Sequence, residues 1–97
     1  MSKSTPENKV KAQVKKVLKE LDAYYAMPAT GGYGSSGVPD FLVCYRGRFY
    51  GIECKANGNK PTALQMDNLM RIRKAGGYGF VIDEDNVHQL KESLCHE

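Results

Sequence analysis

The sequence predicts an α/β fold in which helices flank a mixed β-sheet. Two short runs rich in aromatic and β-branched residues, 41–45 and 49–52, are separated by Arg46 and Gly47, as in a β-hairpin. A helical pattern over about 61–75 then leads to another apolar run at 78–82, which predicts a strand parallel to the second hairpin strand. A chain of 97 residues has room for one core, so we expect a single domain over residues 1–97.

The first helix is expected to begin at Ser4 or Thr5 as N-cap, with Pro6 in its first turn, and to end near residue 21. Its apolar stripe recurs at spacings of three and four residues, at Val10, Val14, Val17 and Leu21. Glu7 extends this stripe toward the amino terminus. An acid on a buried face needs a partner, which is either a capping box with Ser4 or a metal site at the sheet.

The remaining elements follow from local patterns. Residues 23–27 predict either a first strand or, in their amino-terminal half, an extension of the helix. The glycine-rich stretch 31–37 predicts a loop, which either reaches the substrate with Tyr33 available for stacking on a base or is a solvated linker. Residues 78–82 predict a buried strand. A final amphipathic helix is expected over about 86–95, with Asp85 as its cap and three inward apolar residues, Val87, Leu90 and Leu94.

Composition narrows the class of protein. The apolar fraction of 41% and charged fraction of 26% are ordinary for a folded globular domain, and a net charge of +3 does not by itself identify a nucleic-acid binder. The three cysteines lack metal or redox spacing, so we expect free thiols. No apolar stretch approaches a membrane span, which predicts a cytoplasmic protein without a membrane partner. No P-loop ending is present, so we expect no nucleotide cofactor.

The hairpin predicts a cluster of charged side chains. A two-residue turn pairs Tyr45 with Arg48, and counting outward places Asp40 opposite Glu53. Because side chains alternate along a strand, Glu53 and Lys55 project from the same face that receives Asp40. Two opposed carboxylates repel unless a cation lies between them, and Mg²⁺ prefers oxygen ligands of this kind. The alternative is an exposed sheet face that carries an ordinary Glu/Lys pair.

These residues resemble a known nuclease signature. Pro39 and Asp40 followed by Glu53, Cys54 and Lys55 match PD-(D/E)-x-K, and the segment 37–40, the Glu-x-Lys triplet and a helical glutamine at position 65 are similar to VRR-NUC domains. Glu7 matches the family's amino-terminal acid. The resemblance spans nearly the whole chain and implies a restriction-endonuclease-like αβββαβ core with a C-terminal helix. It also implies metal-dependent phosphodiester hydrolysis and a homodimer that acts on branched DNA.

The resulting hypothesis is a DNA endonuclease that uses Mg²⁺ or Mn²⁺. The expected catalytic residues are Glu7, Asp40, Glu53, Lys55 and Gln65, and the expected metal ligands are Glu7, Asp40, Glu53 and Cys54. Lys55 is expected to orient the attacking water or neutralise transition-state charge. Gln65 lies one turn before Leu69, so its amide faces the sheet and either contacts a metal-bound water or phosphate, or makes only structural hydrogen bonds. A noncatalytic DNA-binding subunit and a small metabolic metalloenzyme are the competing hypotheses.

Overall fold

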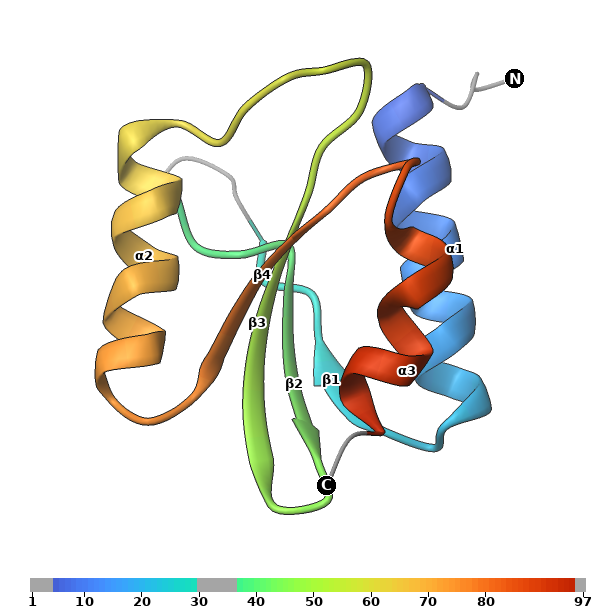
Figure 1. The fold of residues 1–97 in the computed structure, drawn as a ribbon, viewed down its shortest axis with the longest axis vertical. Helices are drawn as coiled ribbons and strands as arrows, with labels where there is room; N and C mark the ends of the chain where they lie inside the picture. The colour runs from blue at the N-terminus through green and yellow to red at the C-terminus, as the bar shows by residue number, and fades with distance from the viewer. Residues whose placement is uncertain (1–4, 30–36, 96–97) are drawn as a thin grey trace.

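The computed structural model describes residues 5–29 and 37–95 (Figure 1). Residues 31–36 of the predicted loop, which include Tyr33, and the possible cap Ser4 lie outside the described residues. The elements in order are α1 (Pro6–Glu20), β1 (Tyr24–Ala26), β2 (Phe41–Tyr45), β3 (Arg48–Cys54), α2 (Ala63–Lys74), β4 (Tyr78–Ile82), the 3₁₀ turn η1 (Val87–Gln89) and α3 (Leu90–Leu94). This order confirms the predicted α/β fold.

The four strands form one mixed sheet in the order β1-β2-β3-β4. β1, β2 and β3 are antiparallel neighbours, whereas β4 runs parallel to β3, as expected for a helical crossover through α2. Tyr45 pairs with Arg48, so the hairpin has the predicted two-residue turn. Arg46 and Gly47 both have positive φ, 54° and 78°, a backbone whose twist matches that of paired strands.

Helices cover both faces of the sheet (Figure 1). α1 and α3 lie side by side on one face, and the buried core between them and the sheet includes Val14, Phe41, Ile52 and Leu90. α2 packs on the other face against β3 and β4. The approach is close, because a Cβ on Gly51 would stand 2.5 Å from Cδ1 of Ile72. Glycine at this position of β3 therefore lets α2 approach the strand that carries Glu53.

The structure corrects three local predictions. The buried positions of α1 are Val10, Val14 and Leu18, while Val17 and Leu21 are only partly buried. The helix advances by 3.6 residues per turn, so a stripe continued at spacings of four reaches Leu18. β4 lies at the sheet edge and is buried only at two of its five residues, which reflects its single strand neighbour.

The third correction concerns the last helical segment. Asp85 is not its cap, because Oδ1 of Asp83 accepts the N–H groups of Asp85 and Asn86, at 2.9 and 3.1 Å. The carboxylate thus closes a turn with the second and third residues after it, a local bond that Asp side chains favour. The segment then begins as a 3₁₀ turn before α3, although Val87, Leu90 and Leu94 are buried as predicted.

Two further expectations can be compared with the described chain. Cys44, Cys54 and Cys95 are free thiols, as predicted. Among the residues that the structure describes, no helix is both long and apolar enough to cross a membrane.

Candidate active site

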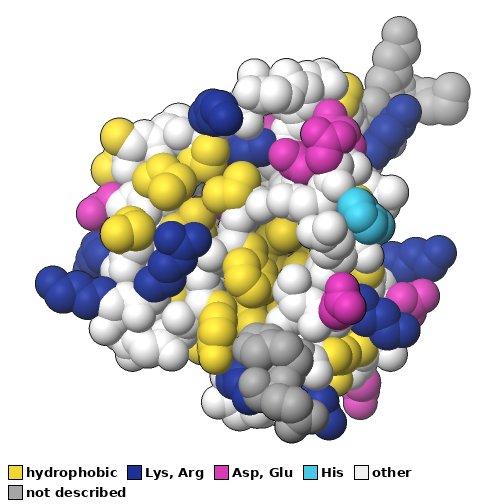
Figure 2. Space-filling model, viewed as in Figure 1, with side chains coloured by type: hydrophobic (Ala, Val, Ile, Leu, Met, Phe, Trp, Pro, Cys, Tyr) yellow, Lys and Arg dark blue, Asp and Glu magenta, His cyan; other side chains and the backbone are white. Residues whose placement is uncertain are grey.

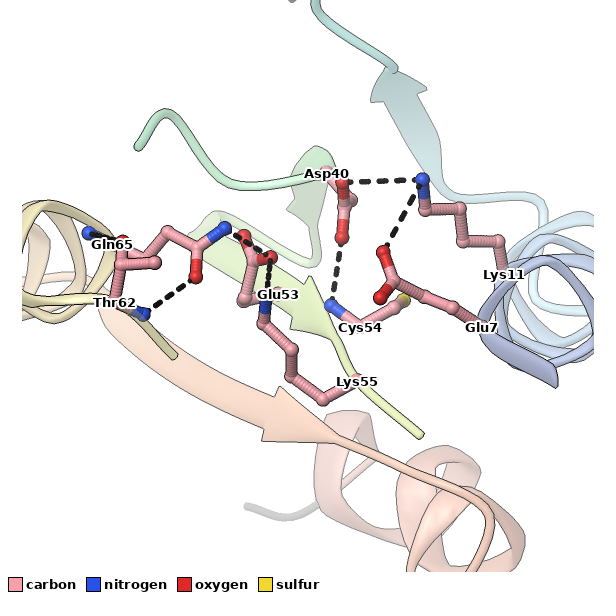
Figure 3. A network of polar contacts seen from close by, with 8 residues as sticks. All are labelled: Glu7, Lys11, Asp40, Glu53, Cys54, Lys55, Thr62 and Gln65. Carbon is pink, nitrogen blue, oxygen red and sulfur yellow. Dashed lines mark hydrogen bonds and ion pairs between the residues drawn. The ribbon is translucent and has the colours of Figure 1, made fainter. Parts of the chain in front are cut away.

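Glu53 lies at the centre of the candidate site. It occupies the penultimate position of β3 on the face that carries α2, and only 2% of it is exposed. Its Oε2 accepts a hydrogen bond from Nε2 of Gln65 at 2.9 Å and lies 3.6 Å from Nζ of Lys55 (Figure 3). Its other oxygen, Oε1, is buried and has no hydrogen-bond partner among the described residues. An unpartnered carboxylate oxygen in a protein interior is costly and calls for a cation or proton.

Burial is the main reason why the pKa of Glu53 is raised, from 4.5 to about 7. The negative charge of Asp40 raises it further, whereas the ammonium of Lys55 opposes the shift. In the metal-free protein Glu53 therefore titrates near neutrality.

Asp40 lies one residue before β2 and opposite the end of β3. The pairing of β2 with β3 ends at Phe41 and Ile52. Beyond this pair the side chain of Asp40 joins the two segments, because its Oδ2 accepts the N–H of Cys54 at 2.8 Å. The chain reaches this position through Gly37, whose φ is +94° and where a Cβ would stand 2.8 Å from the backbone of Leu64 on α2. Glycine is therefore required for the segment that delivers Asp40 to pack against α2.

Gln65 makes hydrogen bonds both to the start of α2 and to the carboxylate of Glu53. Its Oε1 accepts the N–H of Thr62 at 2.8 Å, while its own backbone N–H donates to the Thr62 hydroxyl at 3.2 Å, so the pair forms a capping box at the start of α2. The remaining Nε2 group points to Glu53, at 2.9 Å (Figure 3). One amide thus fixes the helix start and the orientation of the buried carboxylate.

The other two predicted ligands are placed less directly. Glu7 pairs with Lys11 one turn later on α1, at 3.7 Å, and is about one third exposed. Cys54 is fully buried, and burial raises the pKa of its thiol, so the sulfur stays protonated and unsuited to bind a metal. Within the described ranges, no three side chains among His, Cys, Asp and Glu converge closely enough to hold an ion by themselves.

The donor set still fits a magnesium-type ion. Mg²⁺ is commonly bound through one or two carboxylates, with water and substrate phosphate filling the other positions. Asp40 and Glu53 supply these carboxylates at adjacent strand ends, and the bare Oε1 of Glu53 is the oxygen that an ion would satisfy. For Cys54, the hard backbone carbonyl rather than the thiol is the suitable ligand.

Sequence reasoning missed Lys11. Its Nζ lies 3.5 Å from Oδ1 of Asp40 and 3.7 Å from Oε2 of Glu7, so it joins α1 to the acids at the sheet (Figure 3). The only available signal was its position four residues after Glu7, an ordinary spacing for a surface ion pair. The spacing could not indicate Asp40, which is distant in sequence.

Comparisons with known proteins agree with this geometry. A solved structure described as a VRR-NUC domain superposes with a TM-score of 0.74 and 29% sequence identity, over 91% of this chain and 96% of that one. A protein of Acyrthosiphon pisum secondary endosymbiont phage 1, named "Putative nuclease p44", is 36% identical over 58 residues, which are 59% of this chain and 62% of that protein. Profiles of protein families gave no match.

The mixed sheet, the helices on both faces and the acids at adjacent strand ends define a restriction-endonuclease-like α/β domain. Within this class the chain is similar to the solved VRR-NUC domain, on which it superposes over nearly its whole length.

Proposed function

We propose that this protein is a DNA endonuclease that hydrolyses phosphodiester bonds with Mg²⁺ or Mn²⁺. The observation that carries the proposal is the buried Glu53 with its unpartnered Oε1, held beside Asp40 and Lys55 at the end of β3. A carboxylate with a purely structural role is not expected to have a buried oxygen without a partner and a pKa near neutrality, because both features lower the folding stability of the protein. The nuclease name of the phage relative supports the same reaction.

In this proposal each residue of the site has its own role. Asp40, Glu53 and the carbonyl of Cys54 hold the ion, with Glu7 as a further acid on the α1 side. When bound, the ion supplies charge stabilisation to the phosphate and lowers the pKa of a water molecule. The ammonium of Lys55 lies on the same sheet face as Glu53 and neutralises charge that develops on the phosphate. Gln65 keeps Glu53 in one orientation through its 2.9 Å hydrogen bond.

We further propose that the active form is a homodimer which acts on branched DNA. Two-fold symmetry supplies two catalytic centres from a small domain, and a four-way junction has nearly the same symmetry. Leu64, Met66 and Met70 of α2 are exposed, as are the basic Arg71, Arg73 and Lys74 of the same helix. Figure 2 shows hydrophobic and basic side chains next to one another on the side of the molecule where α2 lies. Such a mixed surface supports an interaction role for this side of the molecule.

A cleavage assay tests the proposal. Supercoiled, linear, flap and four-way-junction DNA are incubated with the wild type and with Lys55→Ala, in Mg²⁺ and in EDTA. We expect cleavage only by the wild type in Mg²⁺, with branched substrates preferred. Tight DNA binding without cleavage by the wild type would instead identify a noncatalytic DNA-binding subunit. Equal cleavage in excess EDTA by a preparation free of contaminating nuclease would contradict the metal mechanism.

A further inference from the structure

Lys11 places a positive charge inside the proposed metal site. Its ammonium lies between two acids, 3.5 Å from Oδ1 of Asp40 and 3.7 Å from Oε2 of Glu7 (Figure 3). The side chains of Lys11 and Asp40 are only 29% and 13% exposed, so water screens their pair less than it screens a fully exposed one. Lys11 is therefore a partner of Asp40 as well as the i, i+4 partner of Glu7.

Both oxygens of Asp40 are engaged in this arrangement. Oδ2 accepts the N–H of Cys54 at 2.8 Å, and Oδ1 faces Lys11. A divalent ion that binds Asp40 would meet the ammonium at the same carboxylate, and two cations a few ångströms apart repel. Lys55 does not raise the same conflict at Asp40, because its own partner is Oε2 of Glu53.

Lys11 holds two acids from different segments against one ammonium. Glu7 and Asp40 face the same ammonium, and no three acidic side chains of the described residues converge into one cluster. The ammonium therefore has the place of a counter-ion, which balances these carboxylates and favours their present positions. Because Lys11 is partly exposed, its flexible stem has solvent into which the charged end can withdraw.

We propose that Lys11 is an internal counter-ion which the divalent metal must displace. It stabilises Asp40 and Glu7 before the metal binds and thereby weakens metal affinity, so that it sets the metal concentration at which the site fills. This role is that of a positioning residue and rests on the metal site proposed above. The proposal predicts that removing the ammonium strengthens metal binding, although the same change removes a native ion pair.

The test measures metal binding without DNA or turnover. Metal-free wild type, Lys11→Met, Lys11→Arg and the matched control Lys16→Met are titrated with Mn²⁺, and free Mn²⁺ is followed by electron paramagnetic resonance. Lys16 is exposed on the same helix, so its variant removes the same charge outside the site. We expect Lys11→Met to bind Mn²⁺ about fivefold more tightly, Lys16→Met to change affinity by less than about twofold, and Lys11→Arg to resemble the wild type.

Thermal unfolding supplies a second readout. Lys11→Met is expected to have a lower Tm than the wild type in EDTA but a larger rise in Tm on addition of Mn²⁺, because ligand stabilisation grows with affinity. If Lys11→Met does not fold, Lys11→Gln replaces it, since its amide can still donate to Asp40 without a charge. Affinity that changes no more than in Lys16→Met, or that falls, overturns the proposal for Lys11. A wild type that binds no Mn²⁺ at all overturns it together with the metal site.

Discussion

Gln65 links the start of α2 to Glu53, because its amide accepts from Thr62 N–H at 2.8 Å and donates to Glu53 Oε2 at 2.9 Å. The helix cap and the site therefore share one side chain. A carboxylate at position 65 separates the two roles, since it still accepts from Thr62 but cannot donate to Glu53. Thr62→Ala is the complementary change, which removes the hydroxyl of the capping box and leaves the amide in place.

We expect Gln65→Glu to lower the cleavage rate by roughly ten- to a hundredfold, the usual effect of losing a partner that orients a metal ligand. Its Tm is expected to stay close to that of the wild type at low pH, where the new acid is protonated. Thr62→Ala should lower the free energy of unfolding by about 1 kcal/mol while cleavage stays within about threefold. Rate measurements and thermal melts on both variants check this. Equal rate losses in the two would mean that Gln65 acts through the helix alone.

The roles of Asp40 and Lys55 are separable by metal titration. Asp40→Asn should lose most Mn²⁺ binding, because a carboxylate charge is removed from the site. Lys55→Ala should bind Mn²⁺ at least as well as the wild type, since a nearby cation is lost, yet cleave roughly 10²-fold more slowly or worse. The measurement pairs calorimetric titration with single-turnover cleavage. A Lys55→Ala protein that cleaves at the wild-type rate would show that its assigned role is wrong.

Much of the fold was accessible from the sequence because its signals are local. The two-residue turn between Tyr45 and Arg48 fixes the hairpin register, and the register brings Asp40 to the end of β3. The helical pattern over about 61–75 and the apolar run at 78–82 were enough to predict β4 and its parallel pairing. Alternation along β3 then placed Glu53 and Lys55 on one face, where their ion pair is found.

The remainder depends on contacts between segments that are distant in sequence. Lys11 meets Asp40 only because α1 packs across the sheet, and no spacing in the sequence encodes that distance. The capping box of Thr62 and Gln65 was missed for another reason, since the helix was expected to open at Pro61 and Thr62 without either being assigned as its cap. At Asp83, a bond to its own following residues replaced the expected cap at Asp85.

The raised pKa of Glu53 predicts how the stability of the metal-free protein depends on pH. The folded state holds this proton up to about pH 7, whereas the unfolded chain releases it near 4.5. Glu53 therefore contributes most to folding stability below about pH 4.5, and this contribution falls as the pH rises through 7. The lost contribution is on the order of 3 kcal/mol, from 1.36 kcal/mol per pKa unit.

The variant Glu53→Gln isolates this contribution, because it cannot ionise and its amide keeps an acceptor for Gln65. In EDTA its Tm should be close to that of the wild type at pH 5 and higher at pH 8.5. Addition of Mg²⁺ at pH 8.5 should raise the Tm of the wild type but not that of the variant. Melts over this pH range measure the difference. A wild-type advantage in EDTA that grows toward pH 8.5 would show that the buried charge is satisfied within the protein.

The proposed homodimer predicts how two active sites share one junction. Wild type and Lys55→Ala are mixed in increasing proportion and allowed to exchange subunits before a four-way junction is added with Mg²⁺. If each centre cuts one strand, mixed dimers should leave junctions nicked on a single strand, and the doubly cut product should fall as the square of the wild-type fraction. Light scattering at micromolar concentration gives the mass of the species in solution. A mass of 10.8 kDa, together with doubly cut product that falls in direct proportion to the wild-type fraction, would refute the dimer, because each chain would then act alone.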